Sequence, residues 1–145
     1  MAAPNISPIF TRVGDVTKDG TTGMASQLLT ATADFSGISA NHVLVFTADA
    51  SNGGFVQKLH FCAEGTNAAS VARIYLNNGS VNTTATNNSL LGQLSLPATT
   101  LNNAAATAEP EYQLGFALPL GFRIYVGLGT TVAAGWRCVC LGGKY

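Results

Sequence analysis

Side chains able to bind a metal or act as nucleophiles are few in this chain, which has two histidines, three cysteines and seven acidic residues among 145. His42 precedes one apolar run and His60 lies inside another. Neither belongs to an H-x-x-x-H or H-E-x-x-H motif, the spacings that place metal ligands on one face of a helix. We therefore interpret both histidines as solvated or hydrogen-bonded side chains without a catalytic role.

The cysteines offer one spacing that could bind a metal. Cys138-Val139-Cys140 is a C-x-C pair, and in a strand both sulfur atoms would point to the same face. Two thiolates there could begin a zinc site that Cys62 and His60 complete. The favoured interpretation is that the cysteines are small buried hydrophobic residues. Their odd number argues against a disulfide framework, and we expect neither a metal nor a cofactor.

The remaining motifs give no catalytic assignment. Asp15–Gly20 resembles a fragment of a calcium loop, but it lacks the alternating oxygen ligands and the closing glutamate, so a turn at Asp19-Gly20 is favoured. A nucleophile elbow, a P-loop and a dinucleotide-binding glycine motif are all missing from the sequence. We expect no catalytic residues and no enzymatic activity, and we expect Trp136, the single tryptophan, in the core.

The charge content points to the kind of partner. Only 10% of the residues are charged, against about 25% in a typical soluble domain. Seven basic and seven acidic residues cancel, so the chain lacks the basic patch that nucleic acid or an anionic membrane would require. Low net charge favours association, and we expect a homo-oligomer, either a dimer or a trimer.

The apolar runs and the first residues bear on location. No apolar run approaches the roughly 18 residues of a transmembrane helix. The first residues lack the basic and apolar regions of a signal peptide, which predicts use in the cytoplasm or in a particle assembled there.

Strand signals dominate the chain. Nine short runs are rich in β-branched and aromatic residues and are bounded by Gly, Asn, Ser or Pro. They are Ile9–Val13, Gln27–Thr30, Val43–Thr47, Phe55–Cys62, Val71–Leu76, Leu90–Leu96, Tyr112–Leu118, Phe122–Leu128 and Trp136–Leu141. No helix is convincing. The pattern predicts an all-β chain with a single domain over residues 1–145, folded as a β-sandwich or jelly roll.

Alternation along three runs predicts which side chains face the core. Phe122, Ile124 and Val126 share one face, while Arg123 and Tyr125 share the other. Similar assignments place two further sets inward, namely Tyr112, Leu114, Phe116 and Leu118 in one run and Phe55, Leu59 and Phe61 in the other, with Lys58 and His60 outward.

Long polar connections and an N-terminal arm lie outside the expected core. The three connections, Val13–Ser26, Asn77–Ser89 and Pro97–Pro110, are expected to reach toward or pack on a partner. Residues 1–12 form either an extended arm or a first strand. We expect the apolar part of the arm to lie on a neighbouring molecule. The candidate partner-binding residues are Pro4, Ile6, Pro8, Ile9 and Phe10.

Several segments together resemble a family of small virion proteins of tailed bacteriophages. The segments are Asn5 with Ser7–Thr11 (N-x-SPIFT), Arg73–Gly79 (RIYLNNG), Leu90–Pro97 (LLGQLSLP), Leu118–Val126 (LPLGFRIYV), Ala133–Trp136 (AAGW) and Gly142–Tyr145 (GGKY). The resemblance covers most of the chain and consists of short phrases rather than a mechanistic motif.

The resemblance implies a jelly-roll or related β-sandwich present in many copies on the phage head. Such a decoration, or cement, protein would bind the major capsid protein on the virion surface after assembly in the host cytoplasm. The members of this family have no catalytic residues, so the resemblance implies none in this chain. Two alternatives stay open: a tail, fibre or adaptor component of similar fold, and a carbohydrate-binding module that uses Trp136 and the loop Asn77–Ser89.

Overall fold

Nine strands and one 3-10 turn make up the regular structure of the residues that the computed structural model describes, which are 13–15, 26–32 and 34–145. The elements are β1 (Val13–Asp15), β2 (Ser26–Leu28), β3 (Val43–Thr47), β4 (Gly54–Ala63), β5 (Ser70–Asn77), η1 (Ala85–Asn87), β6 (Asn88–Leu96), β7 (Glu111–Leu118), β8 (Arg123–Leu128) and β9 (Trp136–Lys144). Within these ranges there is no α-helix, and no helix that could cross a membrane.

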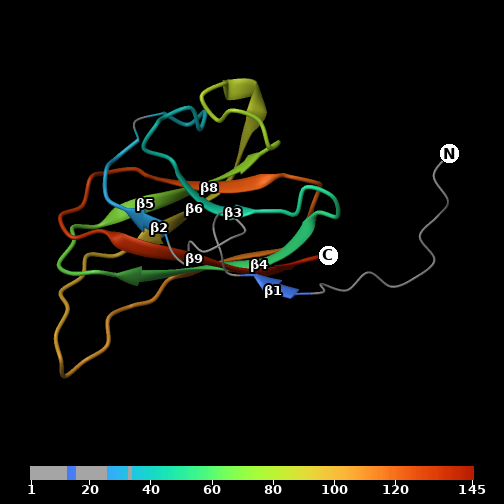
Figure 1. Cartoon of the computed structure of the whole chain (residues 1–145). Coiled ribbons are helices and arrows are strands. Elements are labelled where there is room, and N and C mark those ends of the chain that lie inside the picture. Colours follow the sequence, from blue (N-terminus) through green and yellow to red (C-terminus); the bar gives the residue numbers. More distant parts are fainter. Residues whose placement is uncertain (1–12, 16–25, 33) are drawn as a thin grey trace, which may run out of the picture.

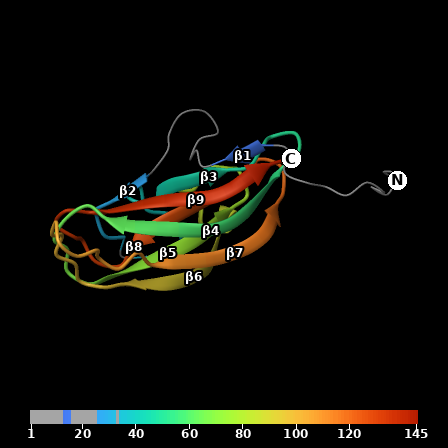
Figure 2. The same ribbon diagram turned by 90° about the horizontal axis from the view of Figure 1, so that it is seen from below.

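The strands form two antiparallel sheets that stack on one another (Figures 1 and 2). One sheet has the order β1-β9-β4-β7, with β2 also paired to β9, and the other has the order β3-β8-β5-β6. β1 and β2 pair with opposite ends of β9. From β2 onward the orders 2-9-4-7 and 3-8-5-6 are those of a double-sheet jelly roll. The predicted fold class is therefore confirmed.

Alternation along β8 shows why the sequence forms a two-layer structure. Ile124 and Val126 are fully buried between the sheets, while Arg123 and Tyr125 lie on the opposite face and are half-buried. This matches the prediction, because side chains in a strand point alternately to the two faces of the sheet. The predicted inward set of β7 also packs against the core, with Leu118 fully buried.

The prediction for β4 is correct in its second half and wrong in its first. Leu59 and Phe61 are fully buried, as predicted. Phe55, however, is only partly buried, and Val56 takes the core position. The reason is a register shift between Val56 and Lys58 against both neighbouring strands, since one extra residue exchanges the two faces of a strand.

One apolar core fills the space between the sheets, with Trp136 as its largest side chain. Trp136 is fully buried, which confirms its predicted place in the core. Tyr112 of β7 reaches across to the other sheet, where a Cβ at Gly92 of β6 would overlap its hydroxyl group. Glycine at this position therefore lets the two layers approach closely along the β6 and β7 side.

The long connections differ from simple loops. Val13–Asp15 and Ser26 belong to strands β1 and β2, so the predicted connection Val13–Ser26 is shorter than expected, and its residues 16–25 lie outside the described residues. The predicted loop Asn77–Ser89 contains η1 and overlaps the ends of β5 and β6. The asparagines there bond within the loop: Asn77 Nδ2 donates to Asn88 Oδ1 at 2.8 Å.

Candidate functional site

The outward face of the β1-β9-β4-β7 sheet carries a compact group of ionisable side chains. His60 and Cys62 are two residues apart in β4, and this spacing puts both side chains on the same face. His60 pairs with Glu111 across the β4–β7 ladder. Glu109 lies two residues before Glu111, which brings it opposite Cys62.

A backbone hydrogen bond continues this alignment beyond the end of β7. The amide of Phe61 donates to the carbonyl of Pro110 at 3.0 Å, so the chain just before β7 stays beside β4. The result is a block of four side chains with metal-binding atoms, of which His60 and Cys62 come from β4, Glu111 comes from β7, and Glu109 comes from the segment just before β7. We refer to Lys58, His60, Cys62, Glu109 and Glu111 together as the β4–β7 cluster.

Short distances connect the members of the β4–β7 cluster. His60 Nδ1 lies 3.1 Å from Glu111 Oε1, and Lys58 Nζ lies 2.6 Å from the same oxygen. On the other side of the imidazole ring, His60 Nε2 lies 3.2 Å from Cys62 Sγ and 3.6 Å from Glu109 Oε2. One ring nitrogen therefore faces Glu111, and the other faces both Cys62 and Glu109.

The charge state of the β4–β7 cluster follows from these contacts. Hydrogen bonds from Lys58 and then His60 lower the pKa of Glu111, so this carboxylate is charged at neutral pH. Burial, assisted by the Glu109 carboxylate, raises the pKa of Cys62. The Cys62 side chain is therefore a protonated thiol at neutral pH. An activated cysteine needs a lowered pKa, so the raised pKa of Cys62 argues against a role for it as a nucleophile.

A second polar group lies farther along the same face. Arg137 Nε donates to Glu64 Oε1, and Gln27 Nε2 donates to Glu64 Oε2 at 2.6 Å. These contacts link β2, β9 and the end of β4. Because the group is solvent-exposed, its contribution to stability is small.

Cys138 and Cys140 point to the opposite face of the sheet from Cys62. In the β4–β9 register, Cys138 pairs with Phe61 and Cys140 with Leu59, both core residues, whereas Cys62 pairs with Arg137. The zinc site suggested by combining Cys138 and Cys140 with Cys62 and His60 is thus wrong, because the two pairs lie on different sides of the sheet.

The favoured interpretation, that the cysteines are small buried hydrophobic residues, holds in part. Cys138 and Cys140 are fully buried hydrophobic residues, and burial, with the nearby Cys140, raises the pKa of Cys138 well above its usual range. Cys62 does not fit this description, because it is only half-buried and its sulfur contacts His60.

His42 is buried, which the sequence interpretation of a solvated or hydrogen-bonded side chain did not foresee. Its ring packs against Tyr75 with 4.6 Å between ring centroids. A Cβ at Gly127 would overlap the His42 ring, so glycine in β8 makes room for it. Burial lowers the pKa of His42, an effect that nearby Asp34 partly offsets. We therefore expect a neutral imidazole at pH 7.

Arg73 holds the connection between β2 and β3 against the outer face of the second sheet. Its Nη1 donates to the Thr32 carbonyl at 2.8 Å, and its guanidinium lies 3.9 Å above the centre of the Phe35 ring. The Tyr75 hydroxyl donates to the Asp34 carbonyl at 3.3 Å. These contacts give Arg73 a structural role.

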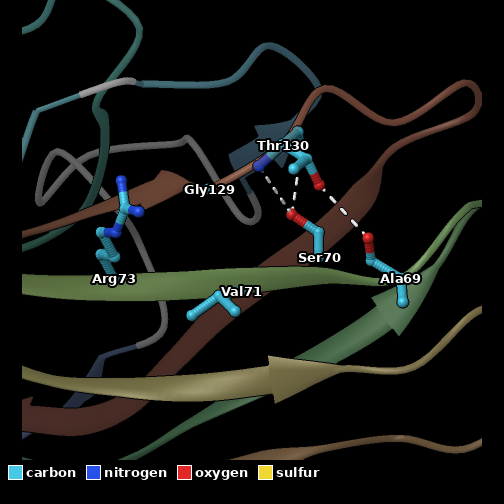
Figure 3. Close-up of a pocket in the computed structure, with 6 residues that line it drawn as sticks. All are labelled: Ala69, Ser70, Val71, Arg73, Gly129 and Thr130. Atoms are coloured by element: carbon cyan, nitrogen blue, oxygen red, sulfur yellow. Dashed lines mark hydrogen bonds between the residues drawn. The ribbon is translucent and has the colours of Figure 1, made fainter.

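A shallow pocket of about 330 Å³ lies beside Arg73 (Figure 3). Ser70 and Thr130 form its other end, where Thr130 N donates to Ser70 Oγ at 3.1 Å and Ser70 Oγ donates to the Thr130 carbonyl at 3.0 Å. The polar groups of Ser70 and Thr130 are thus occupied with one another, and Nη1 of Arg73 donates to the carbonyls of Thr32 and Asp34. Nothing in this arrangement selects a ligand.

The edge strand β6 presents an unusual surface. Among the described residues it pairs only with β5, and its nine residues, Asn88–Leu96, include neither a charged side chain nor a proline. Leu90 and Leu91 are each 36% exposed. Natural proteins commonly protect a long edge strand with charges or prolines, and this one has neither.

Two sequence-based hypotheses about binding residues have different outcomes. Trp136 is buried and offers no stacking surface for a sugar, so the carbohydrate-binding module loses its proposed aromatic platform. The arm residues Pro4, Ile6, Pro8, Ile9 and Phe10 lie outside the described residues, as does most of Asp15–Gly20.

Comparison with known proteins gives no family assignment: no family model, curated protein or solved structure matches this chain. The strand order does define the fold class, which is a jelly-roll β-sandwich.

The sequence interpretation named His60 and Cys62 as possible metal ligands but combined them with Cys138 and Cys140, and it missed Glu109 and Glu111, although two signals were present. His60-Phe61-Cys62 and Glu109-Pro110-Glu111 each place two ligand-type side chains on one face of an extended segment. Only the pairing of β4 with β7 brings the two segments together.

Proposed function

We propose that this chain is a structural virion protein that decorates the head of a tailed bacteriophage, where it binds the lattice of the major capsid protein and stabilises the shell without catalysis. The observation that carries the proposal is the open and uncharged edge strand β6. The resemblance of several segments to phage virion proteins and the jelly-roll strand order, which is frequent in viral capsid proteins, support the same function.

The edge strand supports the proposal because an edge without charged side chains or proline invites pairing with another chain, and the register shift at Leu91 is the one irregularity along it. The outer atoms of β6 are backbone amide and carbonyl groups flanked by Leu90, Leu91 and small polar side chains. Covering this edge removes apolar surface from water and desolvates no charged group within the strand, so the cost of binding is low. A shell protein, or a second copy of this chain in a dimer or trimer, would bind along the edge of β6.

The first experiment is a copy-number measurement on particles of the phage that encodes the chain. Quantitative mass spectrometry would give the ratio of this chain to the most abundant shell protein. A ratio near one to one is the expected result. A ratio of a few copies per hundred shell subunits would instead favour a tail, fibre or adaptor component, and absence from particles would reject the virion role.

A second experiment concerns the N-terminal arm, which lies outside the described residues. Deletion of residues 2–10 should abolish binding to the shell and leave the β-sandwich folded. The reason is that Val13 is the first residue with a sheet partner in the described part of the chain. Circular dichroism would report the fold, and co-sedimentation with shells lacking the protein would report binding. Unfolding of the truncated chain would contradict the role assigned to the arm.

A further inference from the structure

The β4–β7 cluster gathers nitrogen, sulfur and oxygen donors at one point on the outer face of the sheet. His60 Nε2, Cys62 Sγ and a Glu109 carboxylate oxygen all lie within 4.8 Å of one another. We propose that these three atoms bind one Zn²⁺ ion, and that water fills the fourth position. Imidazole, thiolate and carboxylate are the protein ligands typical of zinc, whereas Ca²⁺ and Mg²⁺ prefer oxygen ligands alone.

The distances between the donor atoms fit a tetrahedral ion. Zinc bonds of about 2.0–2.3 Å at tetrahedral angles place neighbouring ligand atoms about 3.4–3.6 Å apart. The distance from His60 Nε2 is 3.2 Å to Cys62 Sγ and 3.6 Å to Glu109 Oε2. Small side-chain adjustments would therefore suffice to form the site, and the backbone of β4 would not have to move.

Glu111 and Lys58 provide the support that a ligating histidine requires. Histidines that bind metals commonly donate their other ring N–H to a carboxylate, which fixes the tautomer and directs the free lone pair at the ion. Glu111 Oε1 lies 3.1 Å from His60 Nδ1 and is itself held by Lys58 Nζ at 2.6 Å. With the proton on Nδ1, the Nε2 lone pair faces Cys62 and Glu109.

The charges balance when the ion binds. Zn²⁺ replaces the proton on the Cys62 sulfur, so that an S–Zn bond forms and one proton leaves to solvent. The thiolate and the Glu109 carboxylate then carry two negative charges that neutralise the ion, while Lys58 and Glu111 neutralise each other. No oxidant or reductant takes part.

A protonated His60 is the competing explanation for the same geometry. An imidazolium would donate to both carboxylates, and the Cys62 thiol would then be a passive neighbour. Neither Cys62 nor a metal would matter in that case. The experiment therefore has to separate binding of a metal through sulfur from a simple ion pair.

The test uses the full chain, kept reduced and stripped of metal. Titration calorimetry with Zn²⁺ should show one ion per chain, and Co²⁺ should give the near-ultraviolet charge-transfer band of a thiolate ligand. Cys62→Ser and His60→Gln should each abolish the band and the one-to-one binding. Glu111→Gln, which leaves all three ligands in place, should weaken binding by about 10–100-fold.

Glu64→Gln serves as the matched control, because Glu64 lies on the same sheet face but bonds to Arg137 and Gln27. It should bind Zn²⁺ as the wild type does. Circular dichroism confirms that each variant is folded, which is expected because Cys62 is not a core residue. Failure of the folded wild type to bind Zn²⁺, or unchanged binding by Cys62→Ser, would overturn the proposal.

Discussion

Replacement of Asn67 by alanine should be among the more destabilising polar substitutions in this protein. Asn67 is only 3% exposed and lies in the connection between β4 and β5. Its Oδ1 accepts from the amides of Ala134 and Gly135, both at 2.9 Å, and its Nδ2 donates to the Gly135 carbonyl at 2.9 Å. The side chain thus fixes the turn before β9.

The magnitude follows from the groups that lose their partner. The hydrogen bond from Gly135 is buried, so its unpaired amide would cost about 1–3 kcal/mol. The Ala134 amide is only partly buried and adds about 1 kcal/mol, because water replaces the lost bond imperfectly. The Gly135 carbonyl adds little, because it keeps a hydrogen bond from the Glu64 amide at 3.0 Å. The free energy of unfolding should fall by about 2–4 kcal/mol, a large share of the roughly 5–15 kcal/mol of a typical domain.

Urea unfolding followed by circular dichroism measures this change. At about 2 kcal/mol per molar urea, the midpoint should fall by about 1–2 M, and Tm should fall by about 10 °C. Asn103→Ala, at an exposed position in the connection before β7, is the control and should change stability by less than about 0.5 kcal/mol. If Asn67→Ala lowered the free energy of unfolding by less than about 1 kcal/mol, the amides of Ala134 and Gly135 would not be left without partners in the variant, and the reasoning would be refuted.

Three further substitutions test other parts of the structure. Gly127→Ala should cost about 1–3 kcal/mol in thermal unfolding, because the new methyl group overlaps the buried His42 ring; a neutral result would show that the ring can move aside. His42 has a lowered pKa in the folded state, so the unfolded chain takes up the proton first, and the free energy of unfolding should decline as pH falls below about 6.5. His42→Gln should make that decline shallower, as measured by urea unfolding between pH 5 and 8, and an unchanged slope would exclude His42 as its source. Leu91→Lys should leave Tm unchanged, because the side chain is exposed, and reduce binding to shells in co-sedimentation by at least about tenfold; undiminished binding would mean that β6 is not the contact.

The fold was largely predictable because strand formation depends on local pattern. The run Val43–Thr47 is identical to β3, and alternation correctly placed Ile124 and Val126 in the core. The exchange of Phe55 for Val56 could not be predicted, since a bulge depends on how β4 aligns with its two neighbours rather than on its own residues.

The candidate site was less predictable for a related reason. His60 and Glu111 are 51 residues apart, and their contact depends on the β4–β7 register. Sequence spacing instead drew attention to Cys138 and Cys140, whose adjacency is local but whose side chains point into the core. A short motif shows which residues of one strand share a face. Only the pairing of strands determines which residues of different strands lie next to one another.

The proposed zinc site and the proposed partner surface can be tested separately because they lie on different sheets. The β4–β7 cluster occupies the outer face of the β1-β9-β4-β7 sheet, whereas the open edge belongs to β6 of the other sheet. Cys62→Ser should therefore abolish zinc binding and leave the copy number in particles unchanged, and Leu91→Lys should do the reverse. If instead Cys62→Ser also removed the protein from particles while the chain remained folded, the ion would have to take part in the contact. The open fourth position of the zinc would then be the natural place for a ligand from the shell.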